Sequence, residues 1–417
     1  MKVTIRPSAP FGKVYAPPSK SMAHRLLICA GLAKGKSSVR GIADSEDILA
    51  TSDCLRMLGA ALEKHGRDAS ENETGRRDIS EISVDGAGFG RCCDETVLDC
   101  RESGSTLRFF IPICLLLDRK IILKGSGRLL QRPLDVYSDI CKAQGILFEK
   151  NDNSVTCKGR LSAGEYVLPG NVSSQFISGL LFALPILDGD STLRIIPPVE
   201  SRPYIDMTLQ AQRSFGVDCY WENENTIIIP GGQRYISGDA DVEGDYSNAA
   251  FLEALNFAGG SVEVKGLAEE TLQGDSVYIK YFDALKRGHA VLDISDCPDL
   301  GPVLFAVAAI CSGGEFAGTA RLRIKESDRA LAMKEELEKF GISVEVNEDS
   351  VSVKKGTLRK PGTELDGHND HRIVMSMVVL SLICGGTIGG AEAVKKSYPD
   401  FFEVLEALHA DIERSEN

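Results

Sequence analysis

The chain has 417 residues, of which 43% are hydrophobic and 26% are charged, and its formal net charge at pH 7 is −13. This length exceeds what one hydrophobic core usually serves, so two or three domains are expected. The acidic balance disfavours nucleic acid and anionic membranes as partners of the surface as a whole, but it leaves room for a local basic pocket.

The N-terminal stretch MKVTIRPSAPFGKVYAPPSKS has no apolar core of signal-peptide length and is typical of a strand and a turn. No run of about 18 apolar residues follows, so no membrane-spanning helix is expected. The 12 cysteines form no CxxC pair. Scattered, reduced cysteines are typical of the cytoplasm, which is the expected compartment.

Six segments repeat one pattern, in which a polar cluster is followed by a run of small and apolar residues that ends near glycine. These runs are apolar on nearly all sides, so they predict buried helices. The segments start at Ser19, Glu102, Ser173, Asp245, Pro298 and Asp370.

A second, amphipathic helix is expected after each buried one, at residues 46–60, 132–145, 202–216, 275–288, 325–341 and 397–410. Short β-like runs such as STLRIIP and NTIIIP lie between the helices. Six copies of this helix–strand unit predict an α/β fold with two lobes of three units. The Gly-rich stretch PGGQRYISGDADVEGD marks the seam. The expected N-terminal lobe is 19–239, and 1–18 plus 240–417 form the C-terminal lobe, whose sheet the first strand completes.

The polar clusters lie where buried helices begin, and helix N-termini attract anions. Taken singly, the serines of these clusters are explained as helix caps: Ser19, Ser21, Ser103, Ser105, Ser173 and Ser174. Cations accompany them at equivalent positions of both lobes: Lys20, Arg25, Arg108 and Arg372 within the clusters, and Arg128, Arg329 and Lys396 in loops. Together they predict a pocket for one or two substrates with several negative charges.

Three other motifs give little support for nucleotide or metal binding. The stretch GLAKGKS from Gly31 is one residue too short for a phosphate-binding P-loop and follows a helix. The stretch GSGRLL from Gly125 lacks the third glycine of a dinucleotide fingerprint. His368 and His371 form an HxxH without further ligands at regular spacing, so no metal is expected.

Nine motifs in order and register resemble a known family over essentially the full length. They are PPSKSMAHR, ESGSTLRF, GSGRLLQRP, LPGNVSSQF, ESRPYID, CPDLGP, IKESDR, NDHR and KKSYPDFF. The chain thereby resembles the 5-enolpyruvylshikimate-3-phosphate (EPSP) synthases, which are enolpyruvyl transferases. The resemblance implies a two-lobed inside-out α/β barrel with three repeated units per lobe, which closes over its substrates.

The reaction implied by the resemblance belongs to the shikimate pathway of aromatic amino-acid biosynthesis, which leads to chorismate. The enolpyruvyl group of phosphoenolpyruvate passes to the 5-hydroxyl of shikimate 3-phosphate by addition and elimination, and phosphate leaves. No metal or organic cofactor is implied, and a monomer is expected.

The resemblance also assigns residues to each substrate. For shikimate 3-phosphate they are Lys20, Ser21, Arg25, Ser173, Ser174, Gln175, Ser201, Tyr204, Asp299 and Lys325. For phosphoenolpyruvate they are Lys20, Gly104, Arg128, Gln175, Arg329, Arg372 and Lys396.

Three residues are expected to be catalytic. Glu326 handles the proton at the methylene carbon, Asp299 orients or deprotonates the 5-hydroxyl, and Lys20 contacts phosphate and shares proton transfer. Lys325 and Arg329 are expected to surround Glu326 with positive charge. Asp328 is expected to orient an arginine.

Some positions depart from the family pattern, namely Glu102, Ser105, Phe109 and Arg321. Two alternatives to this function stay open. One is the related UDP-N-acetylglucosamine enolpyruvyl transferase, which has Lys-Asn where this chain has Lys20-Ser21. The other is a repeat scaffold without catalysis, which does not account for carboxylates and cations at so many helix starts.

Overall fold

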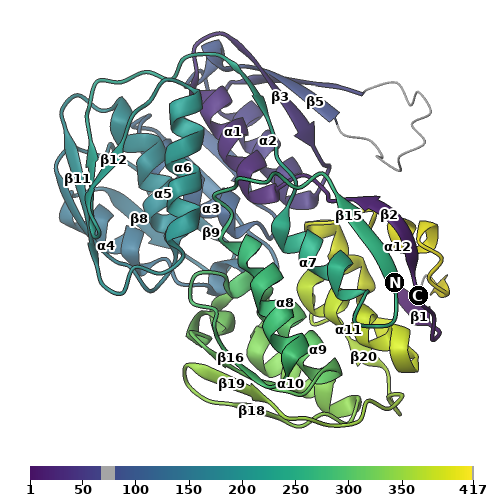
Figure 1. The fold of residues 1–417 in the computed structure, drawn as a ribbon. Coiled ribbons are helices and arrows are strands. Elements are labelled where there is room, and N and C mark those ends of the chain that lie inside the picture. Colours follow the sequence, from purple (N-terminus) through teal and green to yellow (C-terminus); the bar gives the residue numbers. More distant parts are fainter. Residues whose placement is uncertain (67–79, 416–417) are drawn as a thin grey trace. The chain divides into compact units, whose positions relative to one another are not determined.

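The structure is a computed structural model that describes residues 1–66 and 80–415. Helices and strands alternate along these residues (Figure 1). The helices are α1 (Lys20–Leu32), α2 (Glu46–Met57), α3 (Gly104–Cys114), α4 (Asp135–Ala143), α5 (Ser174–Ala183), α6 (Arg202–Ser214), α7 (Tyr246–Ala254), α8 (Tyr278–Arg287), α9 (Gly301–Ile310), α10 (Arg329–Lys339), α11 (His371–Cys384) and α12 (Phe401–Ala407). Each helix expected from the sequence is present, which confirms the repeated pattern.

The described residues form two compact units, each with a hydrophobic core of its own. One unit holds residues 18–66 and 80–243, and is called the 18–243 unit below. The other holds residues 1–17 and 244–415, and is called the C-terminal unit. The lobe boundaries expected from the sequence stay a prediction.

The 18–243 unit contains three four-stranded sheets of one design. Their strand orders are β14 (Asp239–Asp241)-β3 (Lys36–Ile42)-β5 (Ser80–Asp85)-β4 (Ala61–His65), β6 (Glu95–Asp99)-β7 (Lys120–Lys124)-β9 (Ser154–Lys158)-β8 (Leu147–Lys150), and β10 (Glu165–Pro169)-β11 (Ser191–Ile196)-β13 (Thr226–Ile229)-β12 (Tyr220–Asn223). In each sheet the first two strands are parallel and the other pairs antiparallel. A parallel pair needs a crossover, and the buried helices α3 and α5 supply it in two of the sheets.

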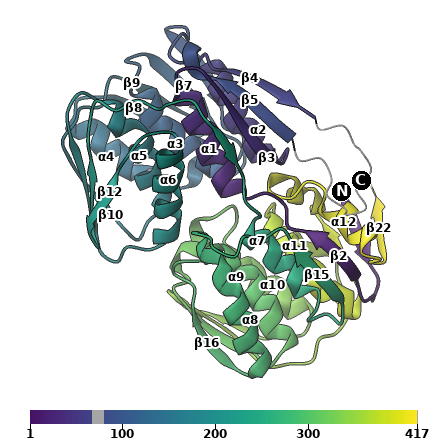
Figure 2. The same cartoon turned by 45° about the horizontal axis from the view of Figure 1, so that its top comes forward.

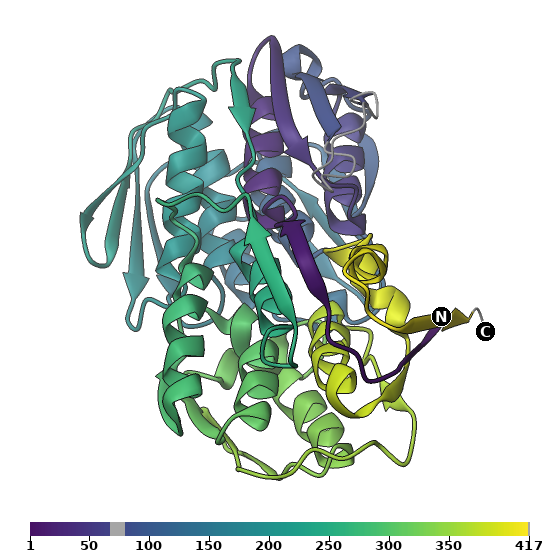
Figure 3. The same ribbon diagram turned by 45° about the vertical axis from the view of Figure 1, so that its right-hand side comes forward.

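Two four-stranded sheets of the C-terminal unit repeat this design, and a parallel pair of strands accompanies them. Its sheets are β16 (Ala290–Asp293)-β17 (Gly314–Ala317)-β19 (Ser350–Val353)-β18 (Val344–Val346), β20 (Leu365–Asp366)-β21 (Gly386–Gly389)-β1 (Lys2–Ile5)-β22 (Ile412–Ser415), and the parallel pair β2 (Phe11–Tyr15)-β15 (Ser261–Lys265). The N-terminal strand β1 is therefore a central strand beside the last strand, β22. Figure 3 shows β2 and β15 side by side.

The helices α1, α3, α5, α7, α9 and α11 are buried on nearly all sides, as their composition predicts. In the C-terminal unit α9 packs against α8, α10 and α11 (Figure 2). The α/β class is confirmed. No sheet of the described residues closes into a barrel, so the expected inside-out barrel consists of open sheets over buried helices.

Polar side chains begin these helices. Ser19, Ser103 and Ser173 each accept a hydrogen bond from a backbone N–H of the first turn, and Asp245 and Asp370 do the same for α7 and α11. Each cap leaves other N–H groups of its helix start available to ligands or neighbouring side chains. Among the described residues, no helix has both the length and the apolar character needed to cross a membrane.

Candidate active site

The guanidinium of Arg329 lies among three carboxylates at the start of α10. Its Nη1 donates to Asp299 Oδ1 at 2.8 Å, its Nη2 to Glu326 Oε2 at 2.7 Å, and its Nε to Asp370 Oδ2 at 2.8 Å. The side chain of Arg329 is 1% exposed. Burial acts to lower the pKa of Arg329, but the three carboxylates outweigh burial and raise it. The cation is thus permanent and rigidly held.

Asp299 joins this arginine to two further predicted site residues. Its Oδ2 lies 3.1 Å from Arg372 Nη2, and its Oδ1 lies 3.1 Å from Lys325 Nζ. Burial acts to raise the pKa of Asp299, but the charges of Arg372, Lys325 and Arg329 outweigh burial and hold this pKa well below its ordinary value. Burial lowers the pKa of the Lys325 ammonium, although Asp299 opposes the shift.

Lys396 approaches the same group from the 3₁₀ helix η7 (Ala391–Lys396). Its Nζ donates to the backbone carbonyl of Asn369 at 2.6 Å, one residue before Asp370. The C-terminal unit therefore brings together all its predicted site residues, and we call this set the cationic cluster: Asp299, Lys325, Glu326, Arg329, Arg372 and Lys396, together with Asp370.

The role expected for Asp328 is wrong. Its carboxylate accepts a hydrogen bond from the backbone N–H of Leu331 at 3.1 Å and so caps α10. Orientation of Arg329 falls instead to Asp370, which the sequence reading did not select. Asp370 is fully buried, and it also accepts a hydrogen bond from Ser327 Oγ at 3.0 Å.

In the 18–243 unit, Gln175 links two helix starts. Arg108 Nη1 donates to Gln175 Oε1 at 2.8 Å, and Gln175 Nε2 donates to Ser105 Oγ at 3.0 Å. Ser173 caps α5, and the buried Ser174 is its first residue. The predicted residues of α5 thus lie beside the start of α3, which carries Gly104 and Arg108.

Arg25 is buried, and its hydrogen bonds link α1 to α6. It donates to the Ser21 carbonyl at 2.7 Å, to the Tyr204 carbonyl at 2.8 Å and to Thr208 Oγ1 at 2.8 Å. Its guanidinium carbon lies 5.4 Å from the ring centre of Phe109 and 6.0 Å from that of Tyr204. Burial lowers the pKa of Arg25 to about 10. Phe109, one of the residues that depart from the family pattern, thus packs in the core and contacts this arginine.

Two residues that contact predicted site residues were not predicted from the sequence. Lys20 Nζ lies 2.7 Å from Asp47 Oδ2, a carboxylate in the first turn of α2. The buried Arg132 lies against Gly104, where a Cβ would come within 2.7 Å of Arg132 Nη1 and 3.0 Å of Arg108 Nη1. Any larger residue at position 104 would therefore displace the two guanidinium groups.

Ser201, the residue before α6, is buried and has a left-handed backbone with φ +56°. For a residue other than glycine this conformation is strained, and such strain is concentrated at functional sites. Ser201 and Tyr204 lie at the start of α6, where Arg25 donates to the Tyr204 carbonyl.

Arg128 is exposed, and its side chain makes no hydrogen bond or ion pair within the described part of the chain. Arg128 therefore makes no hydrogen bond or ion pair with another predicted residue of the described 18–243 unit. Arg321, a departure from the family pattern, is buried and donates to the Ser295 carbonyl.

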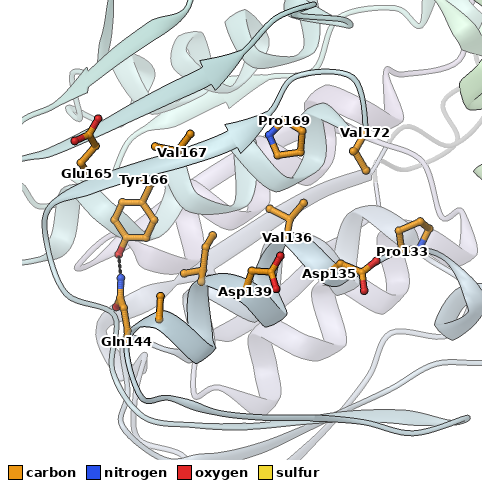
Figure 4. A pocket seen from close by; sticks show the side chains of 12 residues that line it. Pro133, Asp135, Val136, Asp139, Gln144, Glu165, Tyr166, Val167, Pro169 and Val172 are labelled. Carbon is orange, nitrogen blue, oxygen red and sulfur yellow. Dashed lines mark hydrogen bonds between the residues drawn. The ribbon is translucent and has the colours of Figure 1, made fainter.

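A groove of about 600 Å³ lies elsewhere in the 18–243 unit, between α4 and β10 (Figure 4). Apolar and acidic side chains line it, including Val136, Asp139, Tyr166 and Val167. No predicted site residue lines this groove, so it is not the candidate active site.

His368 and His371 do not share a metal-like arrangement. His368 lies with Glu335 and Glu336, and the three offer ligand atoms within 4.8 Å of one another. Lys339 Nζ, however, already lies 2.8 Å from Glu336 Oε1 and pairs with that carboxylate. A metal ion at this place would compete with the lysine.

The open sheets over buried helices, with arginine and lysine gathered at helix starts, define an α/β protein whose polar sites suit anionic small molecules. The EPSP synthase (3-phosphoshikimate 1-carboxyvinyltransferase) family model matches residues 6–405. The chain belongs to this family.

Curated relatives agree with this assignment, and a solved structure has a similar fold. The chain is 38% identical to a 3-phosphoshikimate 1-carboxyvinyltransferase of Clostridium kluyveri, over 99% of this chain and 98% of the relative. It is 40% identical to that of Clostridium beijerinckii, over 97% and 96%. The fold is similar to that of EPSP synthase from Acinetobacter baumannii, with a TM-score of 0.76, 23% identity and all of both chains covered.

Proposed function

We infer that this chain transfers the enolpyruvyl group of phosphoenolpyruvate to the 5-hydroxyl of shikimate 3-phosphate and releases phosphate, as a member of its family does. The observation that carries the inference is the family match over residues 6–405. The cationic cluster supports it, because each substrate carries a carboxylate and a phosphate. Such anions cannot be held in a low dielectric without opposing charge.

Phosphoenolpyruvate is held by Arg329, Arg372 and Lys396 in the C-terminal unit. A substrate anion that binds Arg329 competes with Asp299 and Glu326, which accept hydrogen bonds from this arginine. Each arginine can take an anion with two parallel bonds. On the 18–243 unit the proposed phosphoenolpyruvate-binding residues are Lys20, Gly104, Arg128 and Gln175.

Shikimate 3-phosphate is held mainly by serines at helix starts, where backbone N–H groups also face the ligand. The proposed residues are Lys20, Ser21, Arg25, Ser173, Ser174, Gln175, Ser201, Tyr204, Asp299 and Lys325. The strained backbone of Ser201 supports its place in this set.

The proton steps are assigned to three residues. Glu326 donates a proton to the methylene carbon in the addition step and takes one back in the elimination step, while the proton of the 5-hydroxyl leaves on the released phosphate. Asp299 orients the 5-hydroxyl, because a carboxylate with a pKa well below the ordinary value is a poor proton acceptor while Arg372 and Lys325 face it. Lys20 neutralises the phosphate and shares the proton transfer.

The activity is tested by incubating the protein with both substrates and measuring phosphate. Release is expected with shikimate 3-phosphate as acceptor and not with UDP-N-acetylglucosamine. Release with the nucleotide sugar alone would make the chain the related transferase. No release with either acceptor would favour the noncatalytic scaffold.

Replacement of Gly104 by Ala is expected to raise the KM for phosphoenolpyruvate by about tenfold with the fold retained, because displacing charged partners by a few tenths of an ångström weakens anion binding. The added Cβ pushes the guanidinium groups of Arg132 and Arg108 away. The matched control is Gly362→Ala, whose Cβ meets no atom within 4 Å. Steady-state kinetics in both substrates checks this, and equal KM values for the two variants would contradict it.

The expected cytoplasmic location and monomeric state, and the lobes at 19–239 and 1–18 plus 240–417, belong to this proposal. A solution mass near 45.1 kDa by light scattering supports the monomer, and a mass twice as large overturns it.

A further inference from the structure

The loop between β20 and α11 has an unusual backbone. His368 and Asn369 are consecutive left-handed residues, with φ of +48° and +50°. Asparagine tolerates this conformation better than histidine, and such backbones persist only where the surroundings hold them. The next residue is Asp370, the buried partner of Arg329.

The buried carboxylate of Glu336, two helical turns beyond Arg329 on α10, holds this loop. Glu336 is 1% exposed. Its Oε2 accepts a hydrogen bond from the backbone N–H of Asp366 at 3.1 Å, and its Oε1 lies 3.0 Å from His368 Nε2. Because a carboxylate can only accept, the imidazole donates in the contact with Oε1, and this hydrogen bond is the main cause that raises the pKa of His368.

Lys339 completes the attachment. Its Nζ lies 2.8 and 3.0 Å from the two oxygens of Glu336 and donates to the Glu364 carbonyl at 3.2 Å, just before β20. A salt bridge of this kind inside the protein is not needed for stability in itself, because apolar packing can replace it. Here the ion pair holds both carboxylate oxygens of Glu336 against the loop as hydrogen-bond acceptors. Its role is therefore better explained as positioning of the loop.

The loop delivers two groups to the cationic cluster. The carbonyl of Asn369 accepts from Lys396 Nζ at 2.6 Å, and Asp370 accepts from Arg329 Nε at 2.8 Å. Any shift of the loop relative to α10 therefore moves the partners of two cations at once. Glu336 itself touches none of the cluster's cations within the hydrogen bonds described above.

We propose that Glu336 is a positioning residue for phosphoenolpyruvate binding, which fixes the 366–370 loop on α10 so that Arg329 and Lys396 keep their productive orientation. The proposal rests on the proposed seat of phosphoenolpyruvate at these two cations. It adds a residue that makes no contact with the substrate to the set that determines affinity.

The test compares Glu336→Gln with Glu338→Gln on the same helix. Among the described residues, the Glu338 carboxylate pairs only with the partly exposed Lys334. Glu336→Gln is expected to raise the KM for phosphoenolpyruvate about 10- to 100-fold, because small displacements of binding groups are costly. The KM for shikimate 3-phosphate stays within about twofold, as do both constants of the control. A variant with general damage would change both KM values.

His368→Asn is the second variant, since it keeps the buried pair of Glu336 and Lys339 and decides the question if Glu336→Gln fails to fold. It is expected to raise the same KM in the same direction. Arg329→Met distinguishes a failure of the proposed phosphoenolpyruvate site from a failure of the positioning role of Glu336. If Arg329→Met leaves the KM for phosphoenolpyruvate unchanged, the proposed seat is wrong. If Arg329→Met raises this KM and neither Glu336→Gln nor His368→Asn raises it, the positioning role of Glu336 is wrong.

Discussion

Replacement of Glu326 by Gln is expected to lower turnover by about 10²- to 10⁴-fold, the usual contribution of a general acid or base. The amide keeps the size of the side chain and can still accept the hydrogen bond that Arg329 Nη2 now gives at 2.7 Å. It cannot donate a proton to the methylene carbon as an acid does, nor recover one afterwards. Turnover number is measured by phosphate release at saturating substrates.

Binding of shikimate 3-phosphate to this variant should be nearly unchanged in calorimetry, because Glu326 is not among its proposed ligands. Glu335→Gln is the matched control, since Glu335 lies on α10 but is 63% exposed and is expected to leave turnover unaffected. A Glu326→Gln enzyme with the turnover of the control would remove Glu326 from the proton steps.

Replacement of Asp370 by Asn is expected to destabilise the protein by about 3–5 kcal/mol, the usual result of removing one partner from a buried ion pair. Asp370 is fully buried, accepts two hydrogen bonds from Arg329 and also caps α11. Asparagine can preserve the cap, so the loss reports mainly the charge that faces Arg329. Urea unfolding measures the difference in free energy of unfolding.

Asp328→Asn is the control for that change, because Asp328 caps α10 without touching an arginine in the hydrogen bonds of the described residues, and Asn caps equally well. Its free energy of unfolding should change by less than about 0.5 kcal/mol. If the two variants were equally stable, Asp370 would not be the residue that supports Arg329.

The helices were predictable from the sequence because two local signals coincide at each of them. A run such as MAHRLLICAGL has no polar face, so it must be buried, and Ser19 in front of it is a good cap. The same reasoning gave α3, α5 and α11. Strand order was not predictable, because the pairing of β14 with β3 joins residues about 200 positions apart and leaves no local pattern.

The cations of the C-terminal unit and the pairing of Arg329 with Glu326 were predictable, but the role of Asp370 as a partner of Arg329 was not. Asp370 and Asp328 have the same local signal, an acidic residue before a helix, and only the packing of α10 against the 366–370 loop distinguishes the arginine partner from the cap. Arg132 and Asp47 gave no signal either. Each acquires its role by contacting a residue distant in the sequence, Gly104 or Lys20.

The place of β1 in the middle of a sheet has a consequence for how the chain folds as it is synthesised. The described residues 18–66 and 80–243 have a core of their own and can complete it while the ribosome is still at work. The first strand, by contrast, must stay without its neighbours β21 and β22 until residues beyond 386 have emerged. The strand β1 is thus synthesised long before its two neighbours, and its sheet forms only after β21 and β22 have emerged.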